Sequence, residues 1–510
     1  MIASVSSGTV TGIDAVVVDV EADISNGLPA FYMVGLAEAS VRESKERVKS
    51  AIQNSGYTFP MERVVVNLAP ADLKKEGTGL DLPVALSLLS ASGLVPDKAL
   101  KSSLVIGELS LDGQVKPVRG ALSLVIAARE AGFKEVVVPA KNADEAAMVT
   151  DLKVYPVAQL SQVVEFFTGH TPIHPHSPPL SPSTTASTDT ASGDFSEVRG
   201  QAHAKRAMEI AAAGHHHLLF TGPPGSGKSM LAKRLPTILP PPSFEESLEI
   251  TRIYSVTGRF REGLTAFRPY RSPHHTISDA GLVGGGSNPV PGEISLAHHG
   301  VLFLDELPEF KRNVLEVLRQ PLEEGRVTIA RAGVKSTFPC RFMMVAAMNP
   351  CPCGMHSDPT GSCVCSPAQV RNYRSRISGP LLDRMDIQVE VPRVAVADLV
   401  DRPAGESSEA VRERVSVARQ IQENRFKDSP VFSNAAMTGT LMDRHCALDG
   451  PVRSLLEKAA ERLGLSARAC HAVLKVARTI ADLEQAGAIT SHHLAEAIQY
   501  RSFDRTPGAG

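Results

Sequence analysis

The sequence predicts a multidomain α/β protein, and three features carry this prediction. The segment Gly222–Ser229 has the spacing G-x-x-x-x-G-K-S and lies between an apolar segment and a segment of helical pattern. A second apolar segment, 301–304, ends in the carboxylates Asp305 and Glu306. Residues 171–193 are rich in Pro, Ser and Thr, and they separate this region from the N-terminal third of the chain. A chain of 510 residues is long enough for roughly two to four domains.

The N-terminal third alternates between strand and helix patterns. Strands are expected at 15–20, 63–68, 104–109 and 136–139, and helices at 39–52 and 120–131. The Pro/Ser/Thr-rich stretch lacks the apolar residues that a packed segment needs, so it predicts a flexible linker. The expected domains are an N-terminal α/β domain at 1–168, the linker at 169–194, a nucleotide-binding core with a parallel sheet at 195–395 and a C-terminal helical lid at 396–510.

The glycine-rich segment predicts a loop that wraps around phosphate groups. Its glycines allow the backbone N–H groups to point inward, and the helix that follows directs its N-terminus at the anion. Lys228 is expected to reach the β- and γ-phosphates, and the Ser229 hydroxyl to bind Mg²⁺. The expected ligands are therefore ATP and Mg²⁺; an ordinary Gly/Pro turn is the alternative. The residues assigned to the nucleotide are Gly222, Pro223, Pro224, Gly225, Ser226, Gly227, Lys228 and Ser229.

Polar residues at the ends of two further strands fit the same site. Asp305 follows four apolar residues, so it is expected at the carboxyl end of a buried strand, where it could hold Mg²⁺ while Glu306 polarises the attacking water. Asn349 ends the strand expected at 342–348 and could orient this water or sense the γ-phosphate. The alternatives are an exposed Asp-Glu pair and an asparagine that caps the turn before Pro350.

Two segments of the core read as insertions. The stretch 268–289 is too long for a plain connection, so it predicts an element that projects toward a pore or a substrate, with a structural loop as the alternative. Residues 325–337 alternate like a hairpin with basic residues near the tip. In the lid, a helix is expected at 466–483, and Thr490 or Ser491 caps a final helix. The apolar face of the longer helix consists of Ala469, Val473, Val476, Ala477 and Ile480.

Four of the seven cysteines form two C-x-C pairs, Cys351/Cys353 and Cys363/Cys365. Four thiolates at this spacing could make a tetrahedral zinc site, in which His356 could replace one thiol. Reduced surface cysteines without metal are the alternative. The run of histidines at 215–217 reads as the lead-in to the strand before the phosphate loop, not as a set of ligands.

Composition limits the classes of function. The formal net charge is -2, so any contact with nucleic acid must be local. No apolar run reaches the ~18–20 residues that span a membrane, and the N-terminus lacks the pattern of a signal peptide. Seven cysteines in a chain of this length do not resemble a secreted disulfide framework. These features predict a cytoplasmic protein.

Four motifs, taken in order, carry a resemblance to a known family: Gly222–Ser229, Pro291–Glu306, Asn349–Gly354 and Ser378–Asp386. On these motifs the chain is identified as a member of the ComM (YifB-like) family of AAA+ proteins, which are related to magnesium chelatase motor subunits and replicative helicases. The resemblance covers nearly the whole chain. It implies a ring-forming ATPase and helicase, expected as a hexamer, that acts on single-stranded or branched DNA and drives branch migration during recombination in natural transformation.

The same resemblance assigns two arginines. Arg384 matches the family's arginine finger, which reaches the γ-phosphate bound by a neighbouring subunit, and a guanidinium suits the charge on a transferring phosphoryl group. Arg468 matches the second sensor arginine at the start of a lid helix. From spacing alone, either residue could be a surface arginine in a salt bridge.

The N-terminal domain resembles the proteolytic domain of Lon, a fold of the ribosomal S5 domain-2 type, over Gly107–Gly120. Lon peptidases carry a nucleophilic Ser in a P-S-A-G turn, whereas this chain reads Gly77–Asp81, and Leu122 stands where the resemblance implies a catalytic Lys. Without nucleophile and base, acyl transfer has no catalyst, so no peptidase activity is expected; Thr78 as a substitute nucleophile is the alternative.

Three functions remain to be distinguished: a DNA motor, a remodelling or metal-chelatase-type motor without DNA, and an ATP-dependent protease, which Gly79 and Leu122 argue against. Stimulation of the ATPase by DNA favours the first, and stimulation by an unfolded protein or a porphyrin partner favours the second. The expected contacts to DNA phosphates are Arg326, Arg331 and Lys335, with Arg268 or Arg271 as alternatives.

Overall fold

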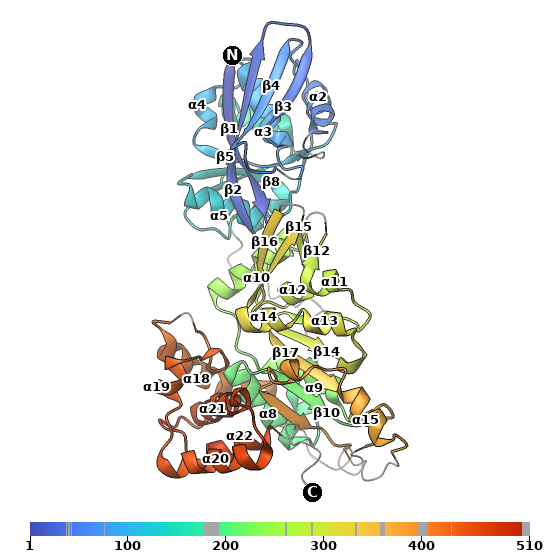
Figure 1. Ribbon diagram of the computed structural model, residues 1–510. Coiled ribbons are helices and arrows are strands. Elements are labelled where there is room, and N and C mark those ends of the chain that lie inside the picture. Colours follow the sequence, from blue (N-terminus) through green and yellow to red (C-terminus); the bar gives the residue numbers. More distant parts are fainter. Residues whose placement is uncertain are drawn as a thin grey trace.

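The computed structural model places three parts of the chain along one elongated molecule (Figure 1). The N-terminal α/β part lies at one end, the core with its parallel sheet follows, and the C-terminal helices pack beside the core. No helix of the described residues is long and apolar enough to cross a membrane. The structure describes residues 1–501 except 37, 39, 40, 42, 76, 178–192, 261, 262, 287, 288, 332, 333, 357–362, 395–404 and 430.

The N-terminal part is built on a mixed seven-stranded sheet with the order β3-β4-β2-β1-β5-β8-β9. Its central hairpin pairs β1 with β2 in antiparallel register from Ile2↔Asp23 to Thr11↔Asp14. Alternate residues of β2 (Val18, Val20 and Ala22) are fully buried, as expected for a strand with one face on the core. The strands are β1 (Ile2–Thr11), β2 (Asp14–Ser25), β3 (Ala30–Val34), β4 (Arg63–Ala69), β5 (Ser103–Val105), β6 (Glu108–Leu109), β7 (Val115–Lys116), β8 (Glu135–Pro139) and β9 (Lys153–Val157).

The helices of this part are α2 (Ser44–Asn54), α3 (Asp81–Ala91), α4 (Asp97–Leu100), α5 (Ala121–Glu130), α6 (Ala143–Ala146) and α7 (Leu160–Thr168). The segment 104–109 was expected as one strand, but it forms two: β5 belongs to the seven-stranded sheet, and β6 pairs with β7. Gly107 interrupts it because its N–H and C=O bond to Gly79 and Leu82 outside the sheet. Helix α2 begins at Ser44, later than expected, and part of the predicted start lies outside the described residues.

Most of the predicted linker also lies outside the described residues. Its first part packs on the N-terminal sheet, because the His176 N–H donates to the carbonyl of Val154 at 2.7 Å and its ring contacts Asp144.

The core is a parallel five-stranded sheet with the order β11-β14-β17-β10-β18. Every residue of β10, β14 and β17 is buried, which is typical of parallel strands covered on both faces. The strands are β10 (Leu218–Thr221), β11 (Tyr270–Arg271), β14 (Val301–Leu304), β17 (Met343–Met348) and β18 (Ile387–Glu390). The helices are α8 (Ala202–Gly214), α9 (Lys228–Ile238), α10 (Phe244–Val256), α11 (Asp279–Val283), α12 (Glu293–Leu296), α13 (Arg312–Glu316), α14 (Arg319–Glu324), α15 (Pro367–Arg374) and α16 (Gly379–Leu382).

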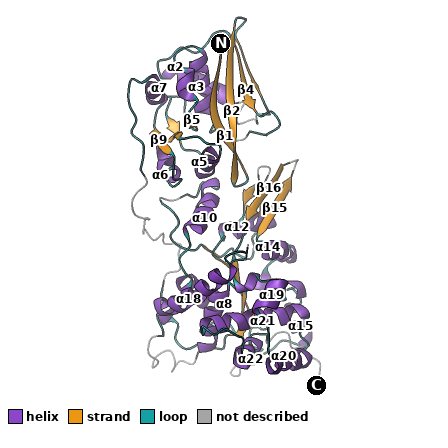
Figure 2. Ribbon diagram, turned by 90° about the vertical axis from the view of Figure 1, so that its left-hand side faces the viewer, coloured by secondary structure: helices purple, strands orange, loops and turns teal. Residues whose placement is uncertain are grey.

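The predicted hairpin is present as β15 (Arg326–Arg331) and β16 (Val334–Pro339), and a short pair, β12 (Gly284–Gly285) and β13 (Val290–Pro291), lies beside it. Figures 1 and 2 both show β15 and β16 reaching the N-terminal part, where Gly12 lies against Ser336 and Thr337.

Helix α10 makes the second contact between the N-terminal part and the core. Arg252 donates to Asp14 at 2.7 Å and to the Ile13 carbonyl at 3.1 Å, and the Gly120 N–H donates to the Ser255 carbonyl at 3.2 Å. The sequence analysis predicted neither this contact nor the one made by the hairpin.

The C-terminal helices are α18 (Ser408–Phe426), α19 (Thr440–His445), α20 (Gly450–Leu463), α21 (Ala467–Leu483) and α22 (Ser491–Gln499). The predicted apolar face of α21 is buried, and Thr490 is the N-cap of α22. Buried His216 links this part to the core, because one ring nitrogen lies 2.9 Å from Asp386 and the other 2.8 Å from Thr479. The histidine run is thus a packed lead-in to β10.

Candidate active site

The phosphate loop leaves the carboxyl end of β10 and opens α9, as the sequence predicts. Gly225 and Gly227 adopt φ values of +76° and +91°, which L side chains rarely adopt. An added Cβ at Gly225 would meet open space, so this side of the loop is free to receive a ligand. The buried Ser226 hydroxyl has no hydrogen-bond partner among the described residues. A glycine-rich loop with open space beside it and an unused buried hydroxyl fits a phosphate.

Lys228 lies at the centre of this loop. Its ammonium group donates to the carbonyls of Gly222 and Pro223 at 2.7 and 2.9 Å and to Oδ1 of Asn349 at 3.2 Å. Burial lowers the pKa of Lys228, and the nearby charges of Asp305 and Glu306 act in the opposite direction. The loop lysine and the strand-end asparagine, 121 residues apart in sequence, therefore meet at one point.

Ser229 and Asp305 form the second half of the site. The Ser229 hydroxyl donates to Oδ2 of Asp305 at 2.6 Å. Both groups are oxygen ligands of the kind that Mg²⁺ prefers, and both adjoin the phosphate loop, so they could hold the ion that accompanies ATP. That ion would neutralise charge on the phosphates.

Glu306 follows in a left-handed conformation with φ +52°, and its carboxylate lies 3.6 Å from the ring of His275. His275 belongs to the long insertion, so this segment reaches the expected water-polarising residue. The backbone N–H of Asn349 donates to the hydroxyl of Tyr373, which fixes the position of this strand end. Burial raises the pKa of Tyr373 to about 12.

The two candidate arginines come together, but away from the phosphate loop. Arg384 donates to Glu323, and Arg468 donates to the same carboxylate oxygen at 2.6 Å. Glu323 lies in α14, 61 residues before Arg384 and 145 before Arg468. No local sequence pattern signals this shared partner.

Strand direction fixes where this pair lies. β10 and β18 are parallel, with Leu218 opposite Ile387. The phosphate loop follows the end of β10, whereas Arg384 precedes the start of β18. Four strand residues at about 3.3 Å each separate the two edges by about 13 Å. Arg384 is therefore at the opposite edge of the sheet from the phosphate loop of its own chain. Arg468, matched to the second sensor arginine, lies with it.

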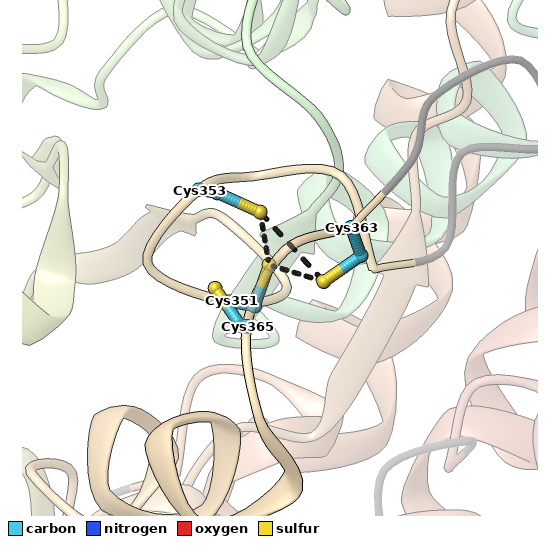
Figure 3. A group of neighbouring side chains, drawn as sticks. All are labelled: Cys351, Cys353, Cys363 and Cys365. Carbon is cyan, nitrogen blue, oxygen red and sulfur yellow. Dashed lines mark hydrogen bonds between the residues drawn. The ribbon is translucent and has the colours of Figure 1, made fainter.

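The cysteine cluster (Cys351, Cys353, Cys363 and Cys365) follows Asn349 at the phosphate edge of the sheet. Figure 3 shows the four sulfur atoms converging from two turns. They all lie within 4.8 Å of one another, so the cluster could bind zinc. His356 is exposed and does not belong to this group. Backbone N–H groups of Met355 and Val364 donate to the Cys353 sulfur and lower the pKa of that thiol to about 6.

Comparison with known proteins agrees with this geometry. Models of the magnesium chelatase subunit ChlI match residues 20–142 and 194–399, and a model of its C-terminal part matches 405–501. The chain is 44% identical to competence protein ComM of Haemophilus influenzae, over 99% of this chain and 98% of that protein. It is 43% identical to the YifB protein of Salmonella typhimurium, with the same coverage. The chain belongs to the ComM/YifB family. It is a magnesium-chelatase-like AAA+ ATPase, and this family membership implies ATP and Mg²⁺ as ligands.

The N-terminal part of this ComM/YifB protein is distantly similar to Lon protease. A stretch of 167 residues, 30% of the chain, is 26% identical to Lon protease of Trichlorobacter lovleyi. At the turn Gly77–Asp81 the Thr78 hydroxyl donates to Glu108, and Leu122 is fully buried in the first turn of α5. A Cβ at Gly79 would lie 3.3 Å from Val118, so a larger side chain there would crowd the turn.

Proposed function

We propose that this chain is an ATP-driven DNA motor that works as a ring, expected as a hexamer, and promotes branch migration of recombination intermediates during natural transformation. The observation that carries the DNA assignment is the likeness to competence protein ComM, which extends over 99% of the chain. The geometry supports the ring, because one chain holds its phosphate loop and its candidate arginine finger at opposite edges of the same sheet.

In this proposal each catalytic site forms between two copies. One copy supplies Lys228, the Mg²⁺ ligands Ser229 and Asp305, and Glu306 as the residue that polarises water, with Asn349 placing the γ-phosphate. The neighbouring copy supplies Arg384, and Arg468 beside it. A guanidinium directed at the γ-phosphate stabilises the charge that develops in phosphoryl transfer. The boundaries 1–168, 169–194, 195–395 and 396–510 remain our proposal for the domains.

The hairpin β15–β16 is the best candidate for the DNA contact. The Arg326 side chain is 65% exposed and Lys335 is exposed, whereas the side chain of Arg331 lies outside the described part of the chain. The alternative candidates, Arg268 and Arg271, already bind groups within the chain. Arg268 binds Glu246 and three carbonyls. Arg271 forms a two-bond ion pair with Glu293 at 2.6 and 2.8 Å.

The decisive experiment measures ATP hydrolysis by the purified full chain with a four-way DNA junction, with linear duplex, and with an unfolded protein. We expect the junction to stimulate hydrolysis and to be resolved into products in the presence of ATP, while Glu306→Gln resolves nothing. Negative-stain imaging in the same mixture should show rings. Stimulation by unfolded protein alone would instead support a remodelling motor.

A chelatase-type motor is the second candidate, because the model for magnesium chelatase subunit ChlI matches the core. It predicts stimulation by a porphyrin-binding partner and indifference to DNA. We infer no peptidase activity for the N-terminal part, since the groups at the Lon-like turn are Thr78, Gly79 and Leu122. A fluorogenic peptide assay tests this directly, with Thr78→Ala as the control for any cleavage seen.

A further inference from the structure

The sulfur positions in the cysteine cluster match one tetrahedral metal ion. Cys351 lies 3.4 Å from Cys353 and 3.7 Å from Cys363, measured between sulfur atoms, and Cys353 lies 3.7 Å from Cys363 (Figure 3). Four sulfurs bound to Zn²⁺ at ~2.3 Å lie ~3.8 Å apart along each edge of the tetrahedron. A disulfide requires ~2.05 Å, so these contacts are not bonded pairs. A cluster of several irons would hold some sulfurs farther apart than the observed limit of 4.8 Å.

Backbone N–H groups are directed at sulfurs of the cysteine cluster. N–H groups of Met355 and Val364 point at the Cys353 sulfur, and the N–H of Cys365 points at Cys363. Such donors stabilise negative charge on ligand sulfurs and orient them toward the metal.

A second group that could hold a metal, Glu249, His298 and His299, lacks this character. Nδ1 of His298 accepts the Arg341 N–H at 2.9 Å, so Nε2 carries the ring proton and donates to Glu249. That nitrogen has no free lone pair for a metal.

The cysteine cluster is joined to the nucleotide site at two points. Asn349, which receives the Lys228 ammonium, precedes buried Cys351 by two residues. Gly354, inside the first cysteine turn, has φ +82°, and an added Cβ would lie 2.4 Å from Cδ of Pro224 in the phosphate loop. The backbone of the cysteine turn therefore lies directly against the loop. The second turn ends at Ser366, the N-cap of α15, whose Arg374 donates to the Pro350 carbonyl at 3.2 Å.

We propose that the cysteine cluster holds one Zn²⁺ ion and that this ion fixes the wall of the nucleotide site formed by Asn349 and Pro224. The second half of this inference rests on the proposed role of the loop in ATP binding. Short turns with few apolar side chains do not hold a fixed position alone, and a metal cross-link supplies the missing constraint. Loss of zinc then loosens the phosphate loop and weakens ATP binding.

Three variants of the full chain separate metal binding from its effect. Cys363→Ser with Cys365→Ser removes two ligands. Gly354→Ala keeps all four thiols but forces a methyl group against Pro224. Cys470→Ser, which alters a thiol of α21 outside the cluster, is the control for the first, and Gly450→Ala, where an added Cβ meets open space, is the control for the second.

Metal analysis of protein never exposed to chelators should find one zinc per chain in the native chain, in both controls and in Gly354→Ala, and none in the double serine variant. Affinity for a fluorescent ATP analogue should fall ~10-fold or more in the double serine variant and in Gly354→Ala, and remain unchanged in the controls. These readouts involve no DNA, so failure of the DNA-motor proposal leaves them unaffected.

If the double serine variant does not fold, Co²⁺ exchange in the native chain tests the metal site instead. The native chain loaded with Co²⁺ should show the strong sulfur-to-cobalt absorption and the visible bands of tetrahedral coordination. Absence of both zinc and this spectrum overturns the metal site. Zinc that is present while Gly354→Ala binds nucleotide normally overturns its link to the phosphate loop.

Discussion

The two edges of the core sheet differ in what they offer a nucleotide. The carboxyl edge gathers Lys228, Ser229, Asp305 and Asn349 within hydrogen-bond distance of one another in two pairs, at 3.2 and 2.6 Å. The amino edge carries Arg384 and Arg468, joined through Glu323, together with buried histidines that lead into the strands. We propose that the groups of one edge bind phosphate and metal and that the cations of the other stabilise phosphoryl transfer.

In our proposal, the carboxyl edge of one chain contributes to one catalytic site, and its amino edge contributes to another. Because the two ends of a parallel strand cannot meet, our proposal requires the amino edge of one copy to face the carboxyl edge of the next. Under this proposal, assembly is a condition for hydrolysis and not for nucleotide binding. The predictions below test this difference, beginning with the largest expected effect.

Arg384→Ala should lower kcat for ATP hydrolysis by ~10³-fold or more, because arginine fingers contribute ~10³–10⁵. ATP binding, measured with a fluorescent analogue, should be nearly unchanged. Mixing Arg384→Ala with Lys228→Ala is the sharper test. Each variant alone is inactive, but adjacent copies in a mixed ring can join an intact loop to an intact arginine. Recovery of activity supports sites shared between copies; a mixture as inactive as its components contradicts them.

Glu306→Gln should lower kcat by ~10²–10⁴-fold, since the amide cannot act as a base toward water. The carboxyl edge keeps Lys228, Ser229 and Asp305, so ATP affinity should be retained and rings should accumulate in the ATP-bound state. Single-turnover hydrolysis and size-exclusion chromatography with ATP measure both effects. A variant that fails to bind ATP would place Glu306 in nucleotide binding instead.

The amino edge should be sensitive to acid. Burial lowers the pKa of His217 and of His298 from 6.5 to about 4, and each ring accepts a backbone N–H at Nδ1. Between these pKa values the unfolded chain binds protons that the folded chain does not. The free energy of unfolding therefore falls as the pH falls from 6.5 toward 4, by ~1.4 kcal/mol for each unit of pKa difference.

Calorimetric unfolding temperatures across this window measure the effect. His217→Asn combined with His298→Asn should flatten the pH dependence, because an amide oxygen accepts the same N–H without titrating. His274→Asn, at an exposed position of the long insertion, should leave it unchanged. Equal slopes in all three proteins would remove these rings as the cause.

Glu323→Gln should have the smallest effect. The Glu323 side chain and that of Arg468 are each 47% exposed, and exposed ion pairs contribute ~0–1 kcal/mol. We expect kcat to change by less than ~5-fold. Steady-state hydrolysis checks this against Arg384→Ala. A loss as large as that of Arg384→Ala would make Glu323 a residue that positions the arginines for catalysis.

Much of this architecture could be predicted from the sequence because its signals are local. The strand before the phosphate loop, the helix after it, the carboxylates after β14 and the asparagine after β17 each follow from a few adjacent residues. The hairpin at 325–337 could likewise be predicted from its alternating pattern, and β15 and β16 confirm it. The single strand expected at 104–109 was wrong, because Gly107 bonds across to Gly79 and Leu82, and neither partner is visible in the local pattern.

Contacts between distant segments could not be predicted. Arg268 and Arg271 read as candidates for DNA contact, yet both are held by glutamates 22 residues away. The approach of Gly354 to Pro224 and the shared partner of Arg384 and Arg468 likewise depend on how helices and loops pack on the sheet.

The sequence by itself indicated a phosphate loop, carboxylates at a strand end and four cysteines in two pairs, since each depends on residue types at short spacing. The two arginines were assigned only by the resemblance to a family. Only the tertiary structure decided where these groups lie. Parallel strand order puts the arginines and the phosphate loop at opposite edges, and packing brings the cysteine turn against that loop. Distances between residues far apart in the chain are set by the shared core, which no short segment encodes.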